Sequence, residues 1–252
     1  MIHPTAIIDP TAQVDPTVVV GPYAVIDAHV VIGPDCTVGP FVHLTGHTTI
    51  GVGNRFHTGA VIGNAPQDLK YRGDPTRLRI GDGNTFREHV TVNRATYPDT
   101  ETVIGSHNLL MACVHVGHDC HVGNRSVLAN GVLLGGHVVI GDRVLLSGNC
   151  LVHQFVRVGT LAMMQGGSGI SLDLPPYTVA RDNNTMCGLN TIGLRRAGLT
   201  SLQRLELRRL YHRLFRGSRP WRQVLEAARA EFTGEHAGVL LDFLAGTQRG
   251  IC

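Results

Sequence analysis

The sequence predicts a mainly β fold: a solenoid of six-residue repeats, shaped as a triangular prism and followed by a small helical domain. Counting in steps of six from Ile2, an apolar residue occurs at every position up to Ile170 except Asp68, Asp74 and Pro98. Neither an amphipathic helix nor a strand with two-residue alternation has this period. A fixed period over such a length is typical of a solenoid.

Each hexad combines a short strand with a corner. Gly often follows the apolar position and Pro often comes next, as at Gly21 and Pro22. Gly tolerates left-handed backbone angles and Pro fixes φ at a turn, so we expect these glycines to adopt left-handed corner conformations. Three hexads make one 18-residue coil. The apolar side chains should therefore stack inside the prism, coil upon coil, about 4.8 Å apart.

The composition agrees with a narrow prism. The chain is 43% hydrophobic but only 5% aromatic, which suits a core of Val, Ile and Leu. The six cysteines show no CxxC pair, and no basic-then-apolar signal stretch precedes the first hexad. No apolar run approaches the ~18 residues of a membrane span. We therefore expect a cytoplasmic protein with no membrane span.

Two interruptions of the repeat divide the first domain, which we assign to residues 1–189. The first is polar and rich in Gly and Pro, and we predict a looped insertion near 64–79. A shorter insertion is predicted near 95–103. The hexads stop just after Ile170.

A helical period begins near Ser201, so residues 190–252 are predicted to form an α-helical domain. Leu202, Leu205, Leu210 and Leu214 mark the apolar face of its first helix. Gly217 and Pro220 end that helix, and another begins near Trp221.

This helical domain is basic. It holds 11 Arg against 5 Asp and Glu, a net charge of +6. A charge run of this kind is often only a solvated helix face, and the alternative is a dock for an acidic protein or a phosphate. Nucleic acid is not expected as a partner, because the segment has no interleaved aromatic residues and no recognised binding motif.

The histidines are candidates for the chemistry. The chain has 14 of them, and three fall between His115 and His121. The 18-residue coil places His118 beside His137, and places His153 one coil further along the same edge. These three imidazoles should lie within roughly 10 Å. An imidazole has an ordinary pKa near 6.5, which suits a general base.

Seven segments together resemble the acyl carrier protein-dependent UDP-N-acetylglucosamine O-acyltransferases, and the resemblance spans essentially the whole chain. It implies a left-handed parallel β-helix, a homotrimer with active sites between subunits, and the first step of lipid A biosynthesis. It also implies no bound cofactor, since the donor chain is carried on the phosphopantetheine of acyl carrier protein. The segments are 66–70, 108–111, 115–119, 136–137, 153–155, 175–177 and 190–196.

The resemblance also implies residue roles. His118 takes the proton from the glucosamine 3-hydroxyl, Asp119 orients or stabilises the imidazole, and the backbone N–H of Gly136 stabilises the oxyanion. A regular strand would point His118 and Asp119 to opposite faces, so their contact requires a corner. The implied substrate-binding residues are Asp68, Lys70, His115, His137, His153, Gln154, Gly166, Asn190 and Arg196.

Among these, Asn190 and Arg196 reach the nucleotide from the neighbouring subunit, and Gly166 is at the stop for the acyl chain, beside the bulky Gln165. At three positions the chain departs from the family pattern. Asn93 replaces a common histidine, Ile192 an acidic residue and Ala197 a second basic residue. These departures leave open whether the acceptor carries a hydroxyl or an amine at its 3-position.

Other functions stay open at this point. A coenzyme A-dependent acetyltransferase could use the same repeat, and so could an acyltransferase for a 3-amino sugar nucleotide. The related N-acyltransferase usually carries an extra N-terminal domain, whereas hexads here begin at residue 2. A γ-type carbonic anhydrase would use three solenoid histidines to bind zinc. A non-catalytic scaffold would not require His118.

Overall fold

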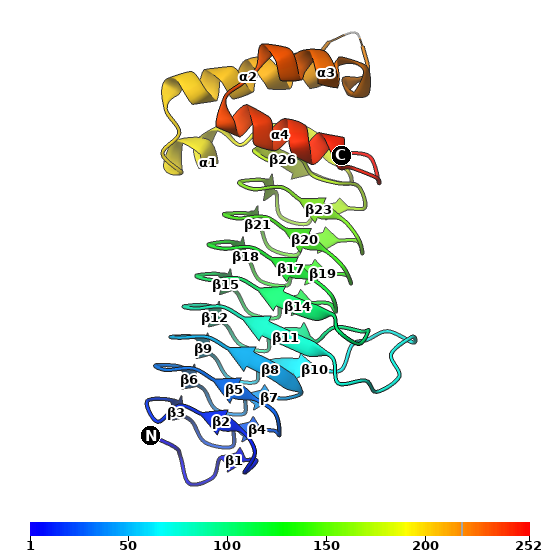
Figure 1. The fold of residues 1–252 in the computed structure, drawn as a ribbon. Helices are drawn as coiled ribbons and strands as arrows, with labels where there is room; N and C mark the ends of the chain where they lie inside the picture. The colour runs from blue at the N-terminus through cyan, green and yellow to red at the C-terminus, as the bar shows by residue number, and fades with distance from the viewer. Residues whose placement is uncertain (218) are drawn as a thin grey trace.

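The computed structural model describes residues 1–217 and 219–252 as a β-helix covered at its C-terminal end by four helices (Figure 1). Very short strands form three parallel sheets, the faces of a triangular prism. Each strand from β1 to β25 pairs with the strand one coil away rather than with its neighbour in sequence, because every coil visits all three faces once. The predicted solenoid is therefore observed.

The first sheet contains β1 (Ile7–Ile8), β4 (Val25–Ile26), β7 (His43–Leu44), β10 (Val61–Asn64), β13 (Thr91–Asn93), β16 (His115–Val116), β19 (Leu133–Leu134), β22 (Leu151–Val152) and β25 (Gly169–Ile170). The second contains β2 (Gln13–Val14), β5 (Val31–Ile32), β8 (His47–Ile50), β11 (Arg77–Ile80), β14 (Glu101–Ile104), β17 (His121–Val122), β20 (Val139–Ile140) and β23 (Arg157–Val158). The third contains β3 (Val19–Val20), β6 (Thr37–Val38), β9 (Arg55–Phe56), β12 (Thr85–Phe86), β15 (Leu109–Leu110), β18 (Val127–Leu128), β21 (Leu145–Leu146), β24 (Met163–Met164), β26 (Thr178–Arg181) and the antiparallel β27 (Thr185–Leu189).

The core is a column of aliphatic side chains inside the prism. In most strands the second residue points inward and is buried, whereas the first faces outward. Leu134 pairs in register with Val152, and Val152 with Ile170, each one coil further on. The stacked rings of Phe56 and Phe86 fill the prism at the level of the first insertion, with centroids 4.9 Å apart. The six-residue period therefore identifies the core residues directly.

The expectation for the corner glycines was wrong. Of the twelve that follow the apolar position, only Gly63 has a positive φ, of 87°. At the other positions glycine is required because the next coil approaches closely and leaves no room for a side chain. A Cβ on Gly105, for example, would lie 2.5 Å from the carbonyl oxygen of Gly123. The left-handed residue comes two positions later and is often not glycine, as at Tyr23, with a φ of 56°. Coil-to-coil spacing, not backbone freedom, selects glycine here.

The two insertions preserve the repeat because they add whole hexads. Val61 of β10 pairs with His43 at the normal spacing of three hexads, but with Thr91 at a spacing of five hexads. Thr91 in turn pairs with His115 at a spacing of four hexads. One coil is therefore longer by two hexads and the next by one, so the apolar positions stay in phase. The longer insertion projects from the side of the prism (Figure 1).

Both insertions are narrower than predicted. The irregular stretches are 65–76 and 94–100, because β11 and β14 already occupy residues that were expected to loop out. Leu78 and Thr102 are buried and pair in register across these strands. Outside the prism, Arg79 forms an ion pair with Glu101 at 2.8 Å. In each of these segments, buried and more exposed residues alternate over four positions, which is the pattern of a β-strand.

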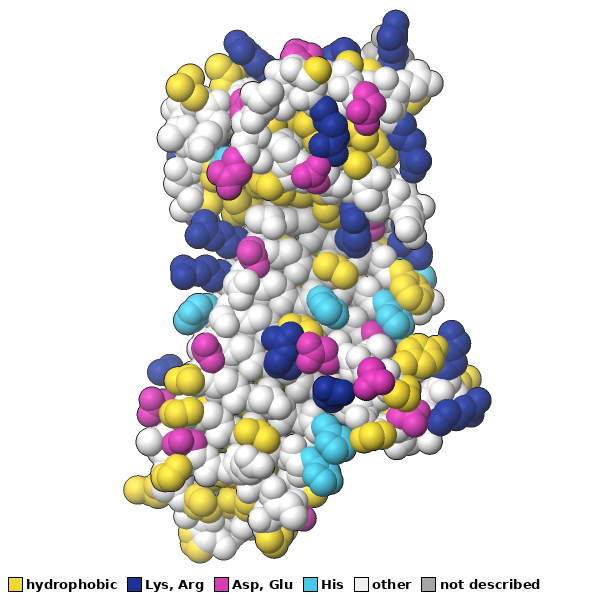
Figure 2. Space-filling view, viewed as in Figure 1, with side chains coloured by type: hydrophobic (Ala, Val, Ile, Leu, Met, Phe, Trp, Pro, Cys, Tyr) yellow, Lys and Arg dark blue, Asp and Glu magenta, His cyan; other side chains and the backbone are white. Residues whose placement is uncertain are grey.

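The helical domain contains α1 (Thr191–Arg196), α2 (Ser201–Phe215), α3 (Trp221–Glu231) and α4 (Glu235–Ala245). Thr200 starts α2 with a capping box that includes Gln203. The apolar face expected for α2 was partly wrong: Leu202 and Leu205 are exposed, because the side that packs on α3 and α4 carries Leu207, Leu210 and Leu214. Basic side chains gather over this cap and along the edge of the prism below it (Figure 2).

An ionic contact fixes the cap to the prism. The guanidinium of Arg157 lies 3.2 Å from the carboxylate of buried Asp173 and donates to the carbonyl oxygen of Phe243, 2.6 Å away. The hydroxyl of Thr247 donates to the same carboxylate at 2.7 Å. The C-terminal segment is thus held against the last coils. In the described parts of the chain, no helix is both long and apolar enough to cross a bilayer.

Candidate active site

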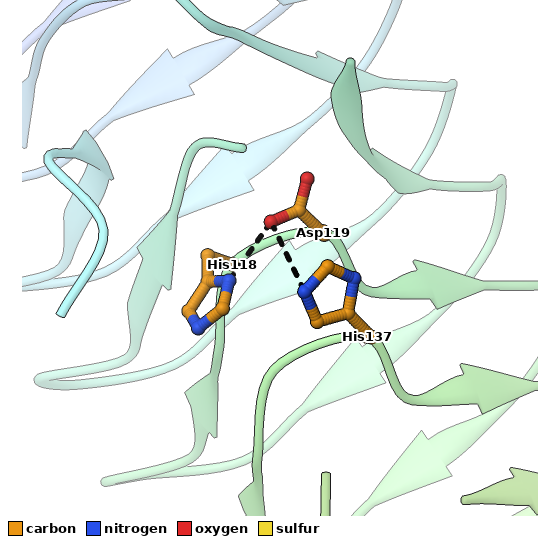
Figure 3. Close-up of side chains that lie close together, drawn as sticks. All are labelled: His118, Asp119 and His137. Atoms are coloured by element: carbon orange, nitrogen blue, oxygen red, sulfur yellow. Dashed lines mark hydrogen bonds and ion pairs between the residues drawn. The ribbon is translucent and has the colours of Figure 1, made fainter. Parts of the chain in front are cut away.

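The corner between β16 and β17 brings His118 and Asp119 together (Figure 3). Asp119 adopts a left-handed conformation, with a φ of 57°, so consecutive side chains turn toward each other instead of alternating. The Nδ1 atom of His118 lies 2.8 Å from Oδ2 of Asp119. With a carboxylate at Nδ1, the favoured tautomer carries its proton there and leaves Nε2 as the basic atom.

The second insertion holds the carboxylate of Asp119. The backbone N–H of Thr96 donates to Oδ2 at 3.1 Å, and the hydroxyl of Thr100 donates to Oδ1 at 3.0 Å. Burial alone would raise the pKa of Asp119, but the hydrogen bonds from His118, Thr96 and Thr100 outweigh it and lower the pKa below the ordinary value. Asp119 is therefore a fixed anion behind the imidazole.

The other nitrogen of His118 faces an open cleft. Its Nε2 atom lies 3.9 Å from Oδ2 of Asp68, which comes from the first insertion. The ring packs directly over Gly136, where a Cβ atom would come within 2.4 Å of Nε2 and Cε1. The absence of a side chain at Gly136 is what allows the imidazole to lie there. A hydroxyl entering the cleft could reach Nε2 without crossing the protein.

Two more imidazoles surround this pair. His137, one coil from Asp119, places Nε2 3.8 Å from the Asp119 carboxylate and stacks on Phe155 with centroids 4.6 Å apart. His115 lies 2.8 Å from the hydroxyl of Thr91. Burial lowers the pKa of both and the nearby His118 lowers each further, which in His137 outweighs the opposing effect of the Asp119 carboxylate. Both are thus favoured as neutral hydrogen-bonding groups at neutral pH.

The cleft has a volume of about 720 Å³ and follows the first sheet over successive coils toward the helical cap. Five predicted site residues line it: His115, His118, Gly136, His153 and Gln154. Beyond them, outward-facing Leu133 and Leu151 form an apolar strip, and Asn183 and Asn184 border its far end. A polar group beside the histidines with a hydrocarbon chain beyond fits this distribution.

Asp68, Asp119 and His137 surround His118, whereas Gly166, Asn190 and Arg196 lie apart from this cleft in a single chain. Lys70 is exposed on the first insertion. Gly166 lies at a corner between the third and first sheets. Asn190 caps α1, accepting from the N–H of Gly193 at 2.9 Å, while its amide donates to the carbonyl oxygen of Leu161. Arg196 borders a different groove, described below.

Sequence reasoning missed the residues that support the site. Thr96 and Thr100 hold Asp119, and Gln67 lines the cleft. The lost apolar position at Pro98 marked a loop, but not which of its residues turn back toward Asp119. Asn93 is buried and donates to the carbonyl oxygen of Ala65 at 2.8 Å, while its Oδ1 finds no partner among the described residues.

Within the described ranges, one group of side chains has the spacing of a metal site: His118, Asp119 and His137, whose donor atoms lie within 4.8 Å of one another. The 2.8 Å separation between His118 and Asp119 is that of a hydrogen bond. Three neutral imidazoles, the ligand set of a γ-type carbonic anhydrase, are not what this group offers. An acid–base pair describes it better.

The lowered pKa of His115 predicts a loss of stability in mild acid. The unfolded chain binds this proton more tightly than the folded protein, so the free energy of unfolding falls as the pH drops below about 6.5. One such proton contributes a slope of at most about 1.4 kcal/mol per pH unit. Urea midpoints at pH 7.5 and 5.5, at one protein concentration, should differ less for His115→Gln than for the unmodified protein. An unchanged pH dependence, equal to that of the exposed control His3→Gln, would contradict this assignment.

Two family models and several curated proteins match this chain. Residues 101–136 match the bacterial transferase hexapeptide model, and residues 173–252 match domain 2 of UDP-N-acetylglucosamine O-acyltransferase. The chain is 50% identical over 254 residues to the acyl-[acyl-carrier-protein]–UDP-N-acetylglucosamine O-acyltransferase of Anaeromyxobacter sp. strain Fw109-5, covering 99% of this chain and 98% of that protein. The corresponding protein of Gloeothece citriformis is 49% identical over 96% of this chain and 88% of its own length.

Solved structures agree with the sequence relatives. The LpxA structure from Acinetobacter baumannii matches with a TM-score of 0.96 and 39% identity, over 99% of this chain and 98% of that one. The UDP-N-acetylglucosamine acyltransferase from Bacteroides fragilis 9343 matches with a TM-score of 0.97 and 38% identity over 100% of both chains. The predicted fold class, a left-handed parallel β-helix with a C-terminal α-helical domain, is confirmed.

Proposed function

Because the chain belongs to the acyl carrier protein-dependent UDP-N-acetylglucosamine O-acyltransferase family, we propose that His118 is the general base of an acyl transfer to UDP-N-acetylglucosamine. The reaction moves a 3-hydroxyacyl chain from acyl carrier protein to the glucosamine 3-position and is the first step of lipid A biosynthesis. One observation supports this role above all: Asp119 holds Nδ1 of His118, so that Nε2 is directed toward an open cleft. The expected cytoplasmic location belongs to this proposal.

The chemical steps follow from this geometry. A sugar hydroxyl is a poor nucleophile at neutral pH, so His118 Nε2 removes its proton as the oxygen attacks the thioester carbonyl. Asp119 stabilises the imidazolium that forms, in the way a buried carboxylate does in a catalytic triad. The tetrahedral intermediate then expels the phosphopantetheine thiolate, and the imidazolium returns the proton to this sulfur. His118 ends the cycle neutral.

The backbone N–H of Gly136 is suited to stabilise the oxyanion. It donates no hydrogen bond to any described backbone carbonyl, whereas its neighbours Gly135 and His137 donate to Val152 and His118. Gly136 occupies the hexad position that holds Pro22 and other prolines, so the fold does not require a donor there. A preorganised, unused N–H beside the base is what an oxyanion site needs.

The sugar nucleotide would lie between two subunits. One subunit would supply the residues on the cleft side: Asp68, Lys70, His115, His137, His153 and Gln154. Its neighbour in a homotrimer would supply Asn190 and Arg196, which lie on a different face. Exposed aliphatic side chains on the outer faces, such as Leu133, Val139 and Leu145, provide apolar surface for that contact. In such an assembly the acyl chain would follow the strip of Leu133 and Leu151.

The end of the acyl groove involves Gly166 in this proposal. A Cβ on Gly166 would lie 3.4 Å from the carbonyl oxygen of Gly148, at ordinary contact distance, so a side chain at this position would project into free space. A larger residue at Gly166 would therefore shorten the groove. The side chain of Gln165, next to it, faces the third sheet's groove instead.

Product analysis tests the function directly. The protein is incubated with UDP-N-acetylglucosamine and, one at a time, 3-hydroxyacyl carrier proteins of different chain lengths, and products are identified by mass spectrometry. A 3-O-acylated sugar nucleotide is expected with a defined preference in chain length. Acylation only of a 3-amino sugar nucleotide would identify the alternative acceptor, and acetylation from acetyl-coenzyme A without activity from acyl carrier protein would overturn the proposed donor.

Carrier-protein docking is expected to depend on the basic face of α2. Arg208 and Arg209 are exposed there, and acyl carrier protein is the partner this charge would attract. Arg208→Glu combined with Arg209→Glu should raise KM for the acyl carrier protein about tenfold at low salt, with a smaller effect at high salt. Arg55→Glu, on the prism far from the cap, should leave this KM unchanged. If the charge reversals change KM for acyl carrier protein equally at low and high salt, or not at all, Arg208 and Arg209 are only solvent-exposed charges and do not bind the carrier protein.

A further inference from the structure

A second groove lies on the third sheet, on a different face of the prism from the cleft at His118. Its volume is about 840 Å³, and it is bounded by the outer side of β21, β24 and β26 and by α1. Leu145, Met163 and Val179 give it an apolar floor. It lies within the size range of small-molecule sites.

Three arginines line this groove, and no carboxylate does: Arg125, Arg143 and Arg196. None of the three forms an ion pair with a carboxylate in residues 1–217 or 219–252. Most other arginines of the prism are paired, as Arg79 is with Glu101 and Arg157 with Asp173. The only charged side chains that line this groove are cations, so its local electrostatic potential favours an anion.

Arg125 and Arg143 are stacked at equivalent corner positions of successive coils. The N–H of Arg143 donates to the carbonyl oxygen of Asn124, and both arginines have left-handed φ angles, of 56° and 53°. The nearby Asp142 does not neutralise them: its Oδ1 accepts from the backbone N–H and the side chain of Asn124, at 2.7 and 3.0 Å. The backbone therefore places two arginines, neither ion-paired within the described residues, on successive coils of one edge.

On the basis of the function proposed above, we infer that Arg143, stacked on Arg125, binds the diphosphate of the sugar nucleotide together with Arg196 of α1. Arg143 and Ala197 both border this groove, so the prism supplies a cation beside the position where α1 has none. Guanidinium groups match phosphate oxygens in geometry and remain charged at any physiological pH. The apolar floor suits the nucleoside.

Because the catalytic cleft and this groove lie on different faces of the prism, two subunits would bind one sugar nucleotide together. The groove belongs to the third sheet and the catalytic cleft to the first, so one nucleotide cannot place its sugar at His118 and its diphosphate at Arg143 of the same chain. The sugar would lie in the cleft of one subunit and the diphosphate in the groove of its neighbour. Arg143 therefore acts in trans.

Isothermal titration with UDP tests this inference without acyl carrier protein and without turnover. Arg143→Gln should weaken UDP binding about tenfold or more, the usual effect of losing a charge-assisted hydrogen bond. Arg143→Lys should recover part of the loss. In kinetic assays KM for UDP-N-acetylglucosamine should rise while kcat changes little, because the diphosphate is remote from the reacting atoms.

Arg222→Gln is the matched control, since it removes an equal charge from the exposed start of α3, away from the groove. Its UDP affinity should equal that of the unmodified protein. If Arg143→Gln binds UDP within twofold of that control, the inference is wrong while the acyltransferase function still stands. If the unmodified protein neither binds UDP nor acylates UDP-N-acetylglucosamine, the proposed function itself fails.

Discussion

Replacing His118 by alanine is expected to lower turnover by about 100-fold or more, the range for losing a general base, with folding retained. The side chain is only 12% exposed, but its ring lies in the wall of the cleft and not in the aliphatic core. The effect should therefore appear in kcat and leave the thermal midpoint nearly unchanged.

The test compares His118→Ala with His29→Ala, a corner histidine outside the cleft. Turnover is measured with saturating UDP-N-acetylglucosamine and acyl carrier protein, and folding by circular dichroism. His29→Ala should retain activity. Near-normal turnover in His118→Ala would refute the mechanism and favour a binding or scaffold role for the cleft.

The fold was largely predictable because a single period carries it. An apolar residue at the same place in nearly every hexad specifies the inward face of each strand, and the period survives both insertions because the longer adds two whole hexads and the shorter adds one. The cap was harder to predict. In α2, Leu202 and Leu205 have the same helical spacing as the buried leucines but are exposed, since burial depends on where α3 and α4 pack.

The glycines show that a correct pattern can be explained by the wrong cause. Their regular spacing is real, but φ is not the reason for it, because the next coil approaches too closely for a Cβ at positions such as Gly105. That contact is with a residue a full coil away in sequence. Local propensity rules describe single residues and cannot detect it.

The positions of the site residues were predictable where the regular 18-residue spacing between coils applies. An 18-residue offset places Gly136 on His118, and the structure shows the glycine directly beneath the imidazole. Thr96 and Thr100 were not predictable, because the second insertion leaves the lattice and its residues have no assigned coordinate. Arg143 has a lattice position, but its significance depends on a groove that is formed with α1.

Gly136→Ala is expected to reduce turnover nearly as much as His118→Ala, by about 100-fold. The φ of Gly136 is not among the left-handed values, so its backbone accepts alanine. The new methyl group would lie 2.4 Å from Nε2 and Cε1 of His118, and the ring must rotate away. That rotation breaks the 2.8 Å contact with Asp119 and removes the base from the cleft.

A double-mutant cycle separates this collision from a general defect. If Gly136→Ala acts by displacing the imidazole, adding it to His118→Ala should cost little further, because the ring it displaces is already gone. Additive losses would instead mean that the methyl group disturbs the oxyanion site or the substrate on its own. Because alanine also reduces the entropy of the unfolded chain, it offsets part of the cost of this collision, and a retained thermal midpoint in Gly136→Ala would assign its inactivity to the position of one ring.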